Sequence, residues 1–147
     1  MTKKILTTSL IFLIFLNFNC KRNDEATTSN GLAGSYRGTV SDTINRAYFG
    51  TLNDYTIVIN PTNTSGQVTL TNNLIITNTG TILGTTFTIP QITATQTATN
   101  KVIESASGTF SGTNNNTWKV TFYQDQLNPT TGVYTAKMKR VCTLVKQ

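Results

Sequence analysis

The chain has 147 residues and a formal net charge of +6, and its length suits a single domain with a core of its own. Only 12% of its residues are charged, and no dense block of lysine and arginine with interleaved aromatics occurs, which argues against a nucleic-acid-binding protein. Because the sequence has no histidine, it excludes Ser-His-Asp and Cys-His catalysis and the common zinc sites. We therefore expect no enzyme, no catalytic residue, no metal site and no cofactor.

The first 19 residues have the organisation of a signal peptide. Lys3 and Lys4 precede a strongly apolar run over residues 5–18, which Asn17 and Asn19 interrupt near its end. A membrane-spanning helix needs about 20 apolar residues, and this run is shorter. Charge, length and position together predict a cleavable secretory signal over residues 1–19.

Cys20 follows the apolar run directly. The segment Leu16-Asn17-Phe18-Asn19-Cys20 resembles the end of bacterial lipoprotein signal peptides, in which the cysteine receives the lipid. Two or more acyl chains on Cys20 would anchor the protein stably to a membrane. Cleavage by an ordinary signal peptidase and an uncleaved anchor are the alternatives. Residues 20–31 are polar and without apolar periodicity, so we expect the lipidated cysteine and a flexible tether there.

From residue 32 onward, apolar residues alternate with threonine and other polar residues, the pattern of half-buried β-strands. Trp118, Val120 and Phe122, for example, alternate with more polar neighbours. Turn signals rich in Asn, Gly and Pro separate the strands. We expect about eight strands, one or two of them fused, near residues 35–40, 54–60, 66–71, 74–78, 82–89, 92–97, 102–111, 117–125 and 133–145. Short turns make consecutive strands antiparallel, which predicts an all-β meander forming a small up-and-down barrel over residues 32–147, with a β-sandwich as the alternative.

The order of these motifs resembles the lipocalin-like (calycin-like) β-barrel lipoproteins of Bacteroidetes. The residues that carry the resemblance include Gly34-Ser35-Tyr36-Arg37-Gly38, Gly108-Thr109-Phe110-Ser111-Gly112 and Trp118-Lys119-Val120. The resemblance implies an outer-membrane lipoprotein in the cell envelope. It also implies that Gly34 and Tyr36 on the first strand pack under Arg140 of the last strand and close one barrel end. The alternative is that Tyr36 is an ordinary core aromatic and Arg140 an ordinary exposed cation.

Two smaller patterns concern single residues. Asp42-Thr43-Ile44 resembles an O-glycosylation site of exported Bacteroidetes proteins, with chance occurrence as the alternative. Cys142 stands among Val141, Leu144 and Val145, which favours a small buried apolar residue over a reactive thiol.

Two functions are consistent with the sequence. The calycin resemblance implies a binding module that holds a small apolar or glycan ligand in its barrel. The alternative is a structural or interaction lipoprotein whose barrel is filled by its own side chains, with an unknown protein partner. An eight-stranded barrel is just wide enough for either arrangement.

Overall fold

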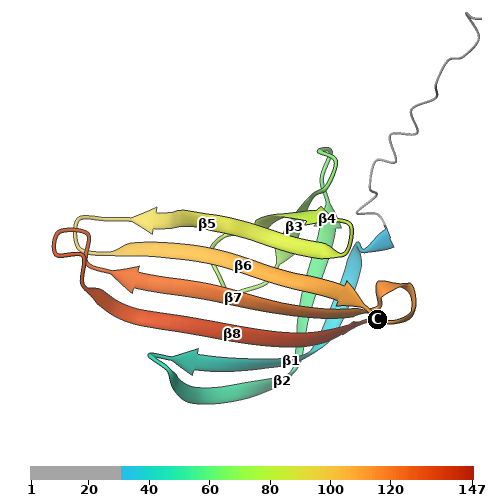
Figure 1. Cartoon of the computed structure of the whole chain (residues 1–147), viewed down its shortest axis with the longest axis horizontal. Helices are drawn as coiled ribbons and strands as arrows, with labels where there is room; N and C mark the ends of the chain where they lie inside the picture. The colour runs from blue at the N-terminus through green and yellow to red at the C-terminus, as the bar shows by residue number, and fades with distance from the viewer. Residues whose placement is uncertain (1–30) are drawn as a thin grey trace, which may run out of the picture.

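Residues 31–147, which the computed structural model describes, form one closed barrel of eight antiparallel strands (Figure 1). Each strand pairs with the next along the chain, and β8 pairs with β1 to complete the circle. The strands are β1 (Gly34–Ile44), β2 (Ala47–Pro61), β3 (Gln67–Thr71), β4 (Thr79–Leu83), β5 (Thr86–Gln96), β6 (Lys101–Ser111), β7 (Thr117–Leu127) and β8 (Tyr134–Lys146), with a short 3-10 helix, η3 (Thr113–Asn115), between β6 and β7. The predicted up-and-down barrel is confirmed, in place of the β-sandwich alternative. The predicted signal peptide, Cys20 and nearly all of the tether lie outside the described residues.

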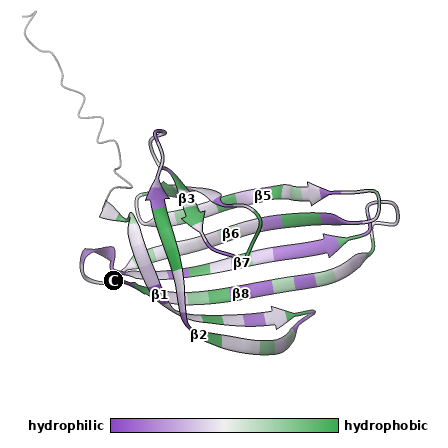
Figure 2. Cartoon of the chain, turned by 180° about the vertical axis from the view of Figure 1, so that it is seen from behind, coloured by the Kyte–Doolittle hydropathy of each residue, from purple (hydrophilic) through white to green (hydrophobic). Residues whose placement is uncertain are grey.

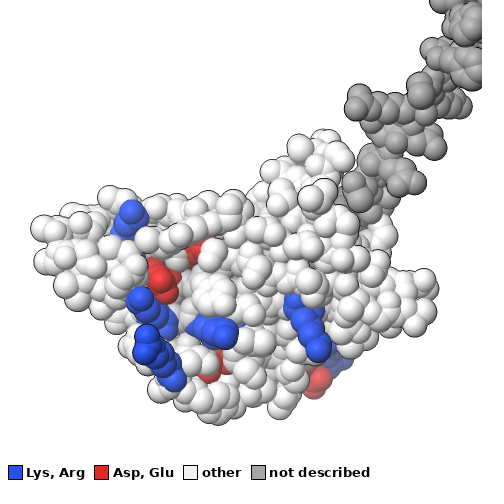
Figure 3. Space-filling view, viewed as in Figure 1, with Lys and Arg blue, Asp and Glu red and all other residues white. Residues whose placement is uncertain are grey.

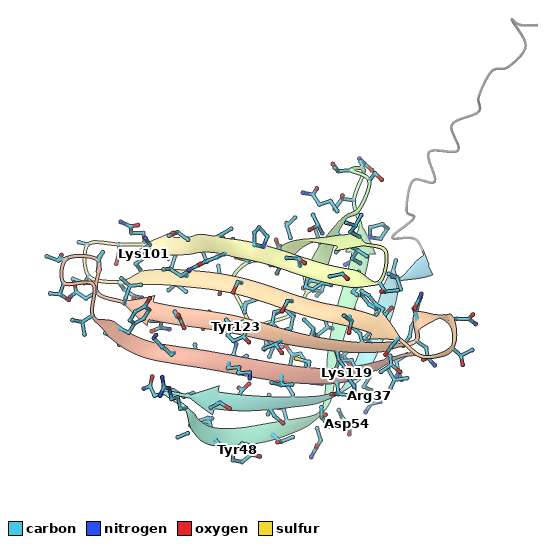
Figure 4. The ribbon with its side chains drawn as sticks, in the orientation of Figure 1. Arg37, Tyr48, Asp54, Lys101, Lys119 and Tyr123 are labelled. Atoms are coloured by element: carbon cyan, nitrogen blue, oxygen red, sulfur yellow. The ribbon has the colours of Figure 1, made fainter. Side chains whose placement is uncertain are left out.

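The alternation of residue types explains why these segments form strands of a barrel. On β7, Trp118, Val120 and Phe122 are buried, whereas Lys119 and Tyr123 are exposed on the outer face (Figure 4). Successive side chains of a strand point to opposite faces of the sheet, so the apolar set faces the core and the polar set faces solvent.

The strand prediction is wrong for residues 74–78, which form a loop between β3 and β4. The side-chain oxygen of Asn72 accepts the backbone N–H of Leu74 at 2.8 Å, and Glu104 accepts the N–H groups further along the loop. These backbone donors therefore bond to side chains and not to a neighbouring strand. The strand expected at 82–89 is divided between the end of β4 and the start of β5, and the strand expected at 92–97 belongs to the same β5.

The hairpin between β1 and β2 extends beyond both predicted strands. Its turn is made by Asn45 and Arg46, which have φ of 51° and 71°. Two positive values are typical of a type I′ turn, whose usual second residue is glycine. The turn is tied to β8, because Asn45 N–H donates to the carbonyl of Lys137 at 2.8 Å and Asn45 Oδ1 accepts the N–H of Lys137 at 2.9 Å.

The circle of strands is complete over only part of the barrel's length. The short strands β3 and β4 bridge β2 and β5, and they reach only residues 58–61 of β2 and residues 86–88 of β5. We call the part of the barrel that contains β3 and β4 the closed half. In Figure 1, β3 and β4 lie at one end of the long strands.

We call the remaining part of the barrel the open half. Within the described part of the chain, residues 47–57 of β2 and residues 89–96 of β5 each lack a strand partner on one side. The open half is therefore a curved six-stranded sheet in the order β5-β6-β7-β8-β1-β2. Figure 2 shows β2 and β3 crossing one end of β6, β7 and β8, while the other end of these strands is not crossed by them.

An aromatic cluster fills the closed half. Trp118 is fully buried at its centre and stacks on Phe110, with ring centroids 5.4 Å apart and planes at 10°. Phe87, Tyr36 and Phe122 meet the Trp118 ring edge-on or nearly so, at centroid distances of 5.2, 5.7 and 6.4 Å. Offset-stacked and edge-to-face contacts of this kind add to the stabilisation from burial. The closed half is thus filled by side chains of the protein itself.

Candidate binding site in the open half of the barrel

A buried carboxylate separates the aromatic cluster from the open half. Glu104 projects inward from β6, is fully buried, and accepts the backbone N–H groups of Ile76 and Thr77 at 2.8 and 2.7 Å. The side-chain amide of Gln124 donates to it at 2.6 Å. Burial alone raises the pKa of Glu104, but these hydrogen bonds outweigh it and hold the pKa below the ordinary value. Glu104 therefore serves as a charged anchor for the loop over residues 72–78.

The anchored loop covers the inner end of the closed half. Its apolar side chains, Leu74 and Ile75, are buried and belong to the core cluster. The backbone N–H of Asn73 donates to the hydroxyl of Tyr55 on β2 at 3.1 Å, which holds the loop from the opposite side. Because β2 and β6 both hold this loop, the aromatic cluster lies behind it and is separated from the concave face of the open half.

The concave face carries an ion pair between neighbouring strands. Asp42 of β1 lies opposite Arg140 of β8 in the register, and Arg140 Nε is 3.4 Å from Asp42 Oδ2. The two side chains are only 20% and 19% exposed. Asp42 Oδ1 and Arg140 Nε are buried and have no hydrogen-bond partner among residues 31–147. The pair thus neutralises its own charge but leaves one acceptor and one donor unsatisfied, which is costly in a native protein.

A cavity of about 230 Å³ adjoins Asp42 and is lined by the facing part of β2. Its other lining residues are Phe49, Gly50, Thr51 and Leu52. Gly50 pairs directly with Asp42, and a Cβ at Gly50 would meet no atom within 4 Å. A glycine opposite Asp42 therefore leaves free space beside the carboxylate.

A β-bulge places Phe49 at this cavity. Asp42 pairs with Gly50 but Thr43 pairs with Tyr48, so Phe49 is an extra residue on β2. Bulges redirect a side chain, and they are frequent next to functional sites. The Phe49 side chain is 74% exposed, an unusual position for a large aromatic ring. The cavity thus combines an apolar aromatic wall with the carboxylate of Asp42.

A second hollow, of about 260 Å³, lies where β4 and β5 separate. It is lined by Gly80 and the neighbouring threonines of β4, and by Ile89, Pro90 and Ile92 of β5. β4 pairs with β5 only as far as Thr88, and Pro90, two residues later, has no N–H to donate. No charged side chain lines this hollow, so it offers less for specific recognition than the cavity beside Asp42.

The structure does not bring Tyr36 and Arg140 together. Tyr36 pairs with Lys146, which lies six positions after Arg140 on β8, a distance of about 20 Å along the strand. Tyr36 is a core aromatic whose hydroxyl donates to the carbonyl of Leu32 at 2.9 Å, and burial raises its pKa to about 12. The basic side chain beside Gly34 is Lys146, whose Nζ donates to the carbonyl of Gly31 at 2.8 Å. The predicted contact of Arg140 with Tyr36 is thus replaced by the Arg140–Asp42 pair.

Thr43, the predicted O-glycosylation site, is half-buried in β1, between Tyr48 of β2 and Lys139 of β8. O-glycosylation there stays a prediction.

Cys142 is fully buried, as predicted, and burial together with the nearby Asp42 charge raises the pKa of its thiol to about 12. The thiol is therefore protonated at neutral pH. Cys20 lies outside the described residues.

The outer face of the barrel carries few charges. Figure 3 shows lysine and arginine side chains scattered over a largely uncharged surface, with no continuous basic patch on the face in view. Over residues 31–147, no group of three or more acidic or cysteine side chains is arranged to hold a metal ion. No helix in the same part of the chain is both long and apolar enough to cross a bilayer.

These features define the protein as a small up-and-down β-barrel with one filled, closed half and one open half. No protein-family model and no curated protein sequence matches the chain. Among solved structures, it is similar to the isotype 1 transferrin binding protein B (TbpB) from serogroup B Neisseria meningitidis, with 19% sequence identity and a TM-score of 0.46. The match covers 78% of this chain and 26% of that one, so the chain spans about a quarter of its length. A likeness at this level transfers no function.

Proposed function

We propose that the protein is a lipid-anchored, non-enzymatic binding module of the bacterial cell envelope, which takes a small ligand in the open half of its barrel. Acyl chains on Cys20 would hold it at the outer membrane, with residues 20–31 as a tether. The eight-stranded barrel agrees with the fold implied by the resemblance to lipocalin-like lipoproteins. The ligand position differs from that expectation, because the closed half is already filled by its own aromatic side chains.

The observation that carries this proposal is the cavity beside the Asp42–Arg140 pair. The Asp42 carboxylate lines this cavity, and Arg140 neutralises its charge from 3.4 Å away. The carboxylate can therefore accept a hydrogen bond from a bound molecule. The adjoining cavity and the exposed Phe49 ring provide space and an apolar wall for that molecule.

Native mass spectrometry of the protein extracted from membranes of its own host tests the proposal. We expect a stoichiometric adduct of small mass on the wild-type protein, and loss of that adduct in the Gly50→Val variant, whose added side chain fills the cavity. An adduct-free wild-type protein would contradict ligand binding.

A second candidate function is favoured by the filled core and by the exposed apolar side chains at the β1–β2 hairpin. Tyr48, Phe49 and Leu52 are 71%, 74% and 52% exposed. Together with the unpaired edge of β2, these side chains suit contact with another protein. This alternative is an interaction lipoprotein without a small-molecule ligand. It predicts that Leu52→Lys abolishes partner binding while native mass spectrometry detects no adduct in either protein.

The anchor has a separate test. Cells are labelled with a fatty acid analogue while they produce the wild-type chain or the Cys20→Ser variant. We expect label on the wild-type protein alone, because the thiol of Cys20 is the proposed acceptor. Equal labelling of both proteins would refute lipidation at Cys20, and it would leave the open-half site unaffected.

A further inference from the structure

We infer that the open-half cavity is a subsite for a single neutral sugar ring, which stacks on Phe49 and bonds through its hydroxyl groups to the Asp42 carboxylate. The inference rests on the proposed binding function and adds the chemical class of the ligand. It follows from three properties of the cavity: its charge, its apolar wall and its size.

The charge of the site favours a neutral ligand with hydroxyl groups. Asp42 lines the cavity and Arg140 neutralises it from 3.4 Å away, so an incoming anion would meet a carboxylate and the attraction of an incoming cation would be offset by the guanidinium. An entirely apolar ligand would cover the carboxylate without giving it a hydrogen bond. A hydroxyl group can donate a hydrogen bond to the carboxylate and carries no charge.

The wall opposite the polar pair is aromatic and aliphatic. Phe49 and Leu52 line the same cavity as Asp42, and both side chains are more than half exposed. A pyranose ring has a face of C–H groups and an edge of hydroxyl groups. Such a ring can place its C–H face on Phe49 while its hydroxyl edge reaches Asp42, which neither a purely apolar nor a purely ionic ligand could do.

The volume of the cavity limits the ligand to about one ring. Pockets for drug-sized molecules measure about 300 to 1,000 Å³, and this cavity has about 230 Å³. The free space in front of Gly50 lies on the same side of β2 as Asp42, its register partner, so the ring would occupy the place where a side chain at Gly50 would stand. A longer glycan would extend from this subsite along the open concave face.

The experiment titrates the membrane-extracted protein, kept in a zwitterionic detergent, with neutral hexoses and N-acetylhexosamines. Hexuronates, hexose phosphates and laurate form the counter-panel. Saturation-transfer NMR reports contact with the ring protons, and calorimetry reports affinity, which we expect in the millimolar range for one ring. Three variants accompany the wild type: Gly50→Val, Phe49→Ala and the control Tyr123→Ala, which removes an exposed aromatic ring from the outer face of β7 (Figure 4). Circular dichroism and Trp118 fluorescence verify that each variant is folded.

We expect binding of at least one neutral sugar, weakened on the order of tenfold or more in Gly50→Val and Phe49→Ala and unchanged in Tyr123→Ala. Sugar binding that both site variants retain would overturn the location. Binding of charged sugars or laurate alone, weakened by the same two variants, would overturn the ligand class and leave the proposed function intact. No binding by any member of the panel, together with an adduct-free native mass spectrum, would overturn both.

Discussion

The closed and open halves of the barrel share the strands β1, β2, β5, β6, β7 and β8, yet the same alternation of residues gives different results in each. On β8, the inward-facing Cys142 and Leu144 are fully buried in the closed half, whereas Met138 and Arg140 in the open half are only partly buried. The difference follows from β3 and β4, which complete the circle of strands at one level only. Alternation therefore determines which face a side chain occupies, and closure of the circle determines how far that face is buried.

The largest difference between the halves should appear when a side chain is truncated. Trp118→Ala removes the centre of the aromatic cluster, and we expect a loss of about 3 to 5 kcal/mol in the free energy of unfolding. Met138→Ala, on the inward face of β8 in the open half, should cost about 1 kcal/mol or less. Urea unfolding followed by circular dichroism measures both. Equal losses would mean that the open half is packed as tightly as the closed half.

Adding a methyl group, instead of removing a side chain, should also destabilise the closed half more than the open half. A Cβ at Gly38 would lie 2.1 Å from the carbonyl oxygen of Thr143, so the backbone of β1 or β8 must move. We expect Gly38→Ala to destabilise by about 1 to 3 kcal/mol. Gly50→Ala, on the facing strand, enters open space and should change stability by less than about 0.5 kcal/mol. Thermal unfolding of the two variants provides the comparison, and a loss in Gly50→Ala as large as in Gly38→Ala would refute the free space beside Asp42.

Glu104 joins the two halves, and its ionisation should make stability depend on pH. Because its hydrogen bonds lower its pKa in the folded protein, the folded state binds a proton less readily than the unfolded state. The stabilisation is therefore complete above the ordinary carboxyl pKa of 4.5 and is lost as the pH falls through the lower folded value. Glu104→Gln should cost about 1 to 3 kcal/mol at pH 7, since its side chain cannot provide two charged acceptors.

The pH dependence is measured by unfolding the wild type and Glu104→Gln between pH 7 and pH 2.5. The wild type should lose more stability than the variant below pH 4.5, so that the two curves converge. Amide hydrogen exchange at Ile76 and Thr77 gives a local readout, which should accelerate in the variant even at pH 7. Parallel curves for the two proteins would show that Glu104 does not hold the loop through its charge.

The sequence predicts the barrel well because alternation and turn residues are local signals. It also contains a signal for Glu104, which stands between Val102 and Ala106 on the inward side of β6. Its bonding partners at residues 76 and 77 could not be predicted, because they lie in a loop that itself resembles a strand. The pairing of Arg140 with Asp42 could not be predicted from the sequence for a related reason. Register depends on bulges and turns such as Asn45-Arg46, which lacks the usual glycine, so the sequence could not place Asp42 opposite Arg140.

The smallest expected effect concerns a second bulge of β2, within the open half. Between Leu52 and Tyr55, β2 has one more residue than the facing part of β1, and Asp54 there has a φ of 60°. Arg37 lies beside it, with Nε 3.6 Å from the carboxylate, but the two side chains are 52% and 77% exposed (Figure 4). Exposed ion pairs contribute little, whereas a left-handed backbone costs most residues about 1 to 2 kcal/mol and asparagine or aspartate much less.

We therefore expect Asp54→Asn to change the free energy of unfolding by less than about 0.5 kcal/mol, and Asp54→Val to reduce it by about 1 to 2 kcal/mol. Urea unfolding at low and high salt measures both variants. The loss in Asp54→Val should be independent of salt, because it arises from backbone conformation and not from charge. If Asp54→Asn cost as much as Asp54→Val and the difference vanished at high salt, the ion pair with Arg37 would hold the bulge. The conformation of β2 at this bulge would then depend on surface charge.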